Sequence, residues 1–114
     1  MGEGRYTSAI YGAVIDNEFV DKLREKDKYI KNIVAKFDLD NKSKLDCCYL
    51  CDDYWVGFHL VNLFDYKTYT LNQLYEIAQV EGYFRDWCLF RDKFLQLTGY
   101  DVEQAQVLIV QDYD

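Results

Sequence analysis

Apolar side chains in the first third of the chain change their spacing, and each spacing predicts a different element. Residues 6–15 are small or β-prone and predict a buried strand, in which Gly12 marks a bulge or close packing. Asp16 and Asn17 then offer a helix N-cap, and apolar residues recur at helical spacing up to Phe37. The stripe lapses at residues 26–28, where Asp27 would cap a second helix. One helix is the simpler interpretation.

The next stretch has the period of a strand. Between residues 45 and 51, Leu45, Cys47, Tyr49 and Cys51 alternate with their neighbours, and the β-prone run 54–61 follows after Asp52 and Asp53. Two such runs around a two-residue polar turn predict a hairpin. An Asp-Asp turn is weaker than Asp-Gly, so it fixes the register less firmly.

Capping signals organise the last part of the chain. Thr70 and Gln73 match a capping box at the start of a helix, and Gly82 ends it. A second helix is expected over 83–97, ended by Gly99, and residues 107–110 predict a final strand. The order β-α-β-β-α-(α)-β is that of a ferredoxin-like two-layer sandwich, with strands 1 and 3 central and the helices on one face. We expect one α+β domain over 1–114, with 1–4 as a flexible leader.

Charge narrows the class of partner. The chain carries 20 Asp and Glu against 13 Lys and Arg, a net charge of −7, together with 11 Tyr. Binding to a nucleic-acid backbone needs a basic stripe, so we expect no direct nucleic-acid partner and favour a basic protein. The apolar runs are too short to span a membrane and the start lacks a signal pattern, which predicts a cytoplasmic protein.

Candidate chemistry is sparse. Cys48 and Cys51 form a C-x-x-C, which His59 and Cys88 would complete as four zinc ligands. Residues three apart on a strand point to opposite faces, so buried reduced thiols are the favoured interpretation. His59 is the sole histidine, and nothing in the sequence links it to a nucleophile such as Ser8 or Cys88. We therefore predict no metal, no cofactor and no catalysis.

Two surfaces remain for recognition. If Tyr54, Val56, Phe58 and Leu60 meet the helices, the opposite face of that strand carries Trp55, Gly57, His59 and Val61. Tyr11 is expected beside them, because Ile10 and Val14 alternate to the core side. An extra helix or the segment 62–70 would be the alternative cover for this face. The second surface consists of acidic and tyrosine residues at the hairpin tip and at the end of the chain: Asp52, Asp53, Asp112, Tyr113 and Asp114.

Small size, acidity and surplus tyrosine together favour a non-catalytic inhibitor of the phage anti-defence or toxin-immunity type. It would block a basic, nucleic-acid-handling enzyme. The alternative is a ferredoxin-like regulatory or ligand-sensing domain that forms a homodimer through its open sheet face. The third hypothesis is the zinc or thiol site.

Overall fold

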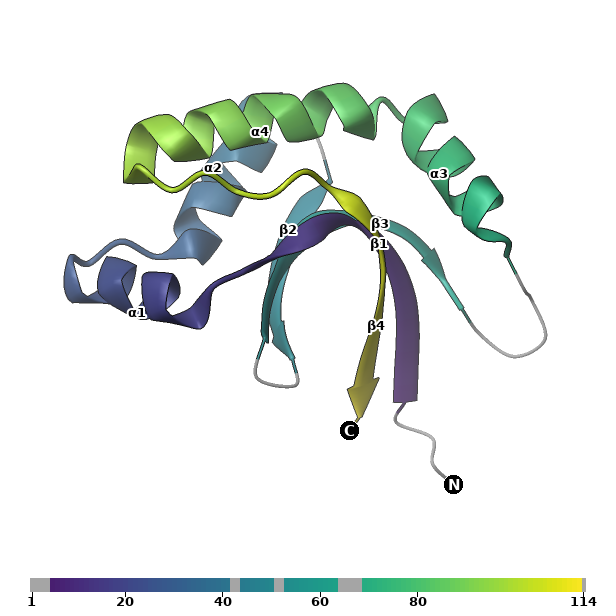
Figure 1. Cartoon of the computed structure of the whole chain (residues 1–114), viewed down its shortest axis with the longest axis horizontal. Coiled ribbons are helices and arrows are strands. Elements are labelled where there is room, and N and C mark those ends of the chain that lie inside the picture. The colour runs from purple at the N-terminus through teal and green to yellow at the C-terminus, as the bar shows by residue number, and fades with distance from the viewer. Residues whose placement is uncertain (1–4, 42–43, 51–52, 64–68, 114) are drawn as a thin grey trace.

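Four helices lie over one face of a four-stranded sheet in the computed structural model, which describes residues 5–41, 44–50, 53–63 and 69–113 (Figure 1). The strand order is β2-β3-β1-β4 and every neighbouring pair is antiparallel, so β1 and β3 are central as predicted. The α+β class is confirmed. In chain order the elements are β1 (Arg5–Ile15), α1 (Asn17–Glu25), α2 (Ile30–Asn41), β2 (Leu45–Leu50), β3 (Asp53–Asn62), α3 (Leu71–Val80), α4 (Tyr83–Thr98) and β4 (Gln106–Tyr113).

The first crossover contains two helices, so the prediction of one continuous helix is wrong. Asp16 caps α1, its carboxylate accepting from the Glu18 amide at 3.2 Å, as expected. At the other end of α1 the Lys28 amide donates back to the Leu23 carbonyl at 2.8 Å, and Asp27 between them adopts a positive φ of 57°. The three charged residues 26–28 offer nothing to bury, so the chain turns there and α2 packs separately.

The hairpin forms, and its ladder is shifted by two residues on β3 from the pairing that a turn at Asp52 and Asp53 would give. The ladder between β2 and β3 runs from Leu45 opposite Phe58 to Leu50 opposite Asp53. Asp53 therefore belongs to the strand and not to the turn. Asp52, the other residue of the expected turn, lies outside the described residues, as does Cys51.

The second crossover follows the capping signals closely. The Gln73 amide donates to Thr70 Oγ1 at 3.2 Å, and the Thr70 amide donates to Gln73 Oε1 at 2.8 Å, which completes the capping box. Gly82 and Gly99, at φ 78° and 77°, follow α3 and α4 in the left-handed conformation that glycine adopts at little cost. β4 is longer than predicted.

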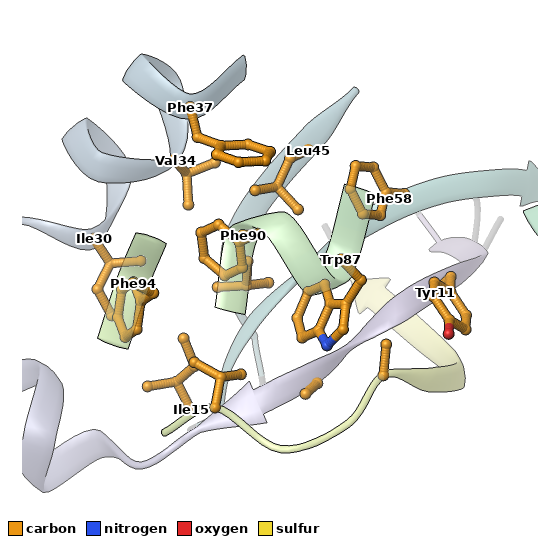
Figure 2. Close-up of a cluster of buried hydrophobic side chains, with 14 of the residues drawn as sticks. Tyr11, Ile15, Ile30, Val34, Phe37, Leu45, Phe58, Trp87, Phe90 and Phe94 are labelled. Carbon is orange, nitrogen blue, oxygen red and sulfur yellow. The ribbon is translucent and has the colours of Figure 1, made fainter. Parts of the chain in front are cut away.

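Aromatic rings of α4 form the centre of the core (Figure 2). Phe90 packs edge-on against Phe37 of α2, with ring centroids 5.5 Å apart, and Phe94 lies beside Ile30. Trp87 is 2% exposed and its indole N–H donates to the Glu103 carbonyl at 3.2 Å, which satisfies its one polar group. These Phe and Trp rings therefore serve the core, whereas only Tyr11 and Tyr83 are buried among the tyrosines whose side chains are described.

Tyr11 lies on the core side of β1, so the expectation that it shares a face with Trp55 is wrong. Its ring is 6% exposed and packs against Phe84 and Tyr75, with centroids 5.1 and 6.2 Å away. Ala13 and Ile15 point the same way, whereas Ile10 and Val14 face the other side. The side chains on both faces of β1 are largely apolar. The small side chain of Ala13 belongs to the same buried cluster as the bulky rings of α4, which favours this choice of face.

The sheet arches away from the helix layer at both ends (Figure 1). Gly12 and Gly57 are paired across β1 and β3 on the face without helices. A Cβ on Gly12 would overlap the Val56 carbonyl oxygen, and one on Gly57 would come within 2.8 Å of the Tyr11 carbonyl oxygen. Only glycine permits this close backbone approach. We call the arched side the concave face; it carries Ser8, Ile10, Gly12, Val14, Trp55, Gly57, His59, Leu108 and Val110.

Candidate functional site

The concave face keeps two of the predicted recognition residues, Trp55 and His59. Trp55 is half-buried opposite Val14, and His59 is exposed opposite Ile10. All four helices of the described residues lie on the other side of the sheet, so no extra helix covers this face in that part of the chain. Curvature nevertheless shields much of it, since Val110 is only 8% exposed.

A β-bulge in β3 changes the composition of this face. The register passes from Ile10–His59 to Ala9–Val61 and so skips Leu60. Val61 is thereby paired with the buried Ala9 and leaves the side of Trp55, contrary to expectation. Asn62 takes the vacated position.

The bulge joins His59 to Ser8 through Asn62, a link that the sequence did not reveal. Asn62 Oδ1 lies 2.8 Å from His59 Nε2 and accepts from Ser8 Oγ at 3.2 Å. An amide oxygen only accepts, so His59 carries its proton on Nε2 in this arrangement. Serine and histidine thus both donate to the same oxygen, which does not activate the serine as a nucleophile.

The acidic surface of the sequence analysis is only partly described. Asp53 is exposed at the end of the β2–β3 ladder. Asp112 and Tyr113 lie in β4, paired with Tyr6 and Arg5 of β1. Asp52 and Asp114 lie outside the described residues. The hairpin end and the β4 end are at opposite sides of the arch (Figure 1), so they form separate surfaces.

The proposed zinc ligands are not brought together as a set. Cys88 is exposed on α4, in the helix layer, whereas His59 projects from the opposite side of the sheet. Cys48 stands opposite Trp55 in the β2–β3 ladder, four residues along β3 from His59, and Cys51 lies outside the described residues. Among the described residues no group of three or more His, Cys, Asp or Glu is placed to hold a metal ion.

A second acidic surface, missed by the sequence analysis, lies on α3. A shallow pocket of about 390 Å³ carries exposed apolar and acidic side chains together, and Val80 is 78% exposed. We call this surface the α3 corner; it consists of Tyr69, Gln73, Glu76, Ile77, Val80 and Glu81. A sequence signal existed, because α3 contains no Lys or Arg.

The residues that line the α3 corner include two carboxylates and no Lys or Arg. The pKa of Tyr83, the first residue of α4, is raised chiefly by burial and then by the charges of Glu81 and Asp86. The guanidinium of Arg85, in the same helix, lies 3.9 Å from the Asp86 carboxylate. Glu76 and Glu81 are both exposed, and the ion pairs found among the described residues do not include them.

Comparison with protein-family models, with curated proteins and with solved structures finds no significant match for this chain. No helix among the described residues combines the length and apolar character that crossing a bilayer requires.

Proposed function

We propose that this protein works by binding a basic protein at the α3 corner, without catalysing a reaction. The observation that carries the proposal is the conjunction of exposed Val80 with Glu76 and Glu81 on a helix that has no cation of its own. An apolar centre flanked by exposed carboxylates suits a partner surface of Lys and Arg around an apolar patch.

The class of partner we favour is an enzyme that handles nucleic acid. Such an enzyme presents a cationic surface to phosphates, and a carboxylate-bearing protein can occupy that surface. The protein would then act as an inhibitor of the phage anti-defence or toxin-immunity type. Its net charge of −7 would speed the encounter with a basic enzyme.

The experiment is affinity capture from the lysate of the source cell, followed by binding of the purified captured protein. We expect binding that weakens as salt rises and is lost in Glu76→Lys/Glu81→Lys. Glu18→Lys, which reverses an exposed charge on α1, is the matched control and should retain binding. The captured enzyme should also be inhibited in its nucleic-acid reaction. Equal binding by the α3 variant and the α1 variant would contradict the proposal.

We also propose that the fold is a variant of the ferredoxin-like sandwich. Support comes from the strand order, which reads β4-β1-β3-β2 from the other edge, with antiparallel neighbours throughout and helical crossovers between β1 and β2 and between β3 and β4. Each crossover here has two helices in place of one.

The concave face supports a second candidate, a regulatory domain that forms a homodimer or senses a ligand there. The apolar side chains of Ile10, Val14 and Trp55 have no helix layer above them in the described residues. Light scattering on the wild type and on Trp55→Asp separates the candidates. A stable dimer that this change dissolves would favour the second, and a wild-type monomer would leave it without support.

A further inference from the structure

A groove between α2 and α4 has a chemistry unlike the rest of the molecule. It has a volume of about 590 Å³ and lies where these helices run over one another in the helix layer (Figure 1). Its apolar lining includes three side chains that remain largely exposed: Tyr29 at 45%, Leu89 at 45% and Leu97 at 44%. Exposed apolar side chains that line one groove mark an interaction site.

The charge of the groove is opposite to that of the whole chain. Lys28, Lys36 and Lys93 line it together with Asp27 and Asp40, so cations outnumber anions there. The protein as a whole carries −7. Lys28 Nζ also donates to the Leu97 carbonyl oxygen at 3.5 Å, which links the two walls of the groove.

The walls suit a helical occupant. On α4 the lining residues Leu89, Lys93 and Leu97 are spaced four apart and form one stripe along about 12 Å of helix. The α2 wall, from Tyr29 to Asp40, is about 16 Å long. A helix of about three turns spans both walls and can place its apolar side against Leu89 and Leu97.

The base of the groove is firm. Phe37 lines it and is 5% exposed, held by its edge-on contact with Phe90 (Figure 2). A preformed groove does not have to be ordered when an occupant binds, which lowers the cost of association.

We infer that the α2–α4 groove binds an acidic amphipathic helix of a partner protein, beyond the function proposed for the α3 corner. The apolar side of that helix packs on Tyr29, Leu89 and Leu97, and its carboxylates meet Lys36 and Lys93. The groove lies at the end of the helix layer opposite α3 (Figure 1), so the two surfaces can be occupied together.

The test uses a designed peptide of about 18 residues, long enough to hold a helix, with leucines three and four apart and glutamates on the flanks. A second peptide has lysine in place of every glutamate. Each is titrated to millimolar concentration into the ¹⁵N-labelled full chain. We expect the acidic peptide to shift the amide signals of residues 28–40 and 89–97. It should bind at least tenfold more tightly than the basic peptide, and its affinity should fall as the salt concentration rises.

Three variants assign the binding to the groove. The affinity for the acidic peptide should fall at least tenfold in the double variant Lys36→Glu/Lys93→Glu. It should fall by at least as much in the single variant Leu89→Gln. Lys31→Glu changes the same charge on α2 outside the groove and should stay within twofold. Circular dichroism confirms that each variant is folded.

Four outcomes would overturn the inference: no shifts with the acidic peptide, equal or tighter binding of the basic peptide, equal binding by the groove variants and Lys31→Glu, or a wild-type oligomer that Lys36→Glu/Lys93→Glu dissociates. The last would assign the groove to a second copy of the chain. None of these outcomes bears on the α3 corner, whose variants are tested separately.

Discussion

Gly12 of β1 and Gly57 of β3 stand directly opposite each other on the concave face, where a Cβ on either residue would come too close to the backbone of the other strand. Neither glycine has a positive φ. Glycine is required at both positions because a Cβ would overlap backbone atoms of the other strand. The pair lets the sheet arch away from the helices. That arch partly encloses Trp55 and Val14 on a face over which the described part of the chain places no second layer.

Gly12→Ala should therefore destabilise the protein strongly, by about 3 kcal/mol, because the new methyl group would overlap the Val56 carbonyl and backbone atoms cannot swing aside. Gly57→Ala meets less severe contacts and should cost less. Urea denaturation measures both. Gly99→Ala is the comparison, since no atom lies within 4 Å of its added methyl and only the left-handed backbone, about 1–2 kcal/mol, opposes it. Equal stability of the Gly12 variant and the wild type would contradict the close approach.

Thr70→Ala should lower the free energy of unfolding by about 1 kcal/mol, because it breaks one half of the capping box and leaves the Gln73 amide without its acceptor. The α3 corner depends on this helix, so the variant should also weaken the binding of any partner at that surface. Asn72→Ala changes an exposed residue of the same turn and serves as control, with an expected change within about 0.5 kcal/mol. Thermal unfolding of the pair tests the prediction, and similar losses in both would refute it.

Local signals predicted the element order apart from the second helix of the first crossover, and the misses occur where two local patterns compete. Capping residues such as Thr70 and Gly99 encode the ends of α3 and α4 directly, so both helices were found. β1 carries apolar side chains on both of its faces, so its local pattern does not say which face is buried. Tyr11 is buried because its face meets the rings of α4, which lie far away in sequence. The break after Glu25 depends on the return of the Lys28 amide to Leu23.

Candidate sites were harder to predict because they depend on placement between elements. Trp55 and His59 could be assigned to one face from the period of the strand alone. The bulge at Leu60, which moves Val61 away and brings Asn62 to His59, leaves no mark in the local pattern. The α2–α4 groove joins residues more than fifty positions apart, such as Tyr29 and Leu89. No sequence period relates them.

The two tryptophans should report different environments. Trp87 is 2% exposed, whereas Trp55 is half-buried on the concave face. We expect Trp55→Phe, which keeps Trp87, to emit at shorter wavelength and to resist quenching by iodide. Trp87→Phe, which keeps Trp55, should be quenched more readily. Its free energy of unfolding should also fall by about 1–3 kcal/mol, since the Glu103 carbonyl loses its donor. Equal quenching of the two variants would show that the concave face is covered.

High pH should destabilise the protein through Tyr83. Burial, and then the charges of Glu81 and Asp86, raise the pKa of Tyr83 above 10.0 in the folded state. The folded chain therefore holds this proton where the unfolded chain has released it. The stabilising contribution is complete below pH 10 and is lost as the pH rises through the folded-state pKa of Tyr83.

Urea denaturation at a series of pH values from 9 upward, with absorbance at the tyrosinate band, follows this loss. Tyr83→Phe removes the residue's share of the pH dependence. Glu81→Gln should bring the pKa of Tyr83 partway toward its ordinary value, by less than the effect of burial, because burial is the larger cause. Lys22→Gln, a charge removed from α1 at the far end of the helix layer, should leave the titration of Tyr83 unchanged. A Tyr83 pKa unmoved by Glu81→Gln would mean that Glu81 does not supply the negative potential on which the α3 corner relies.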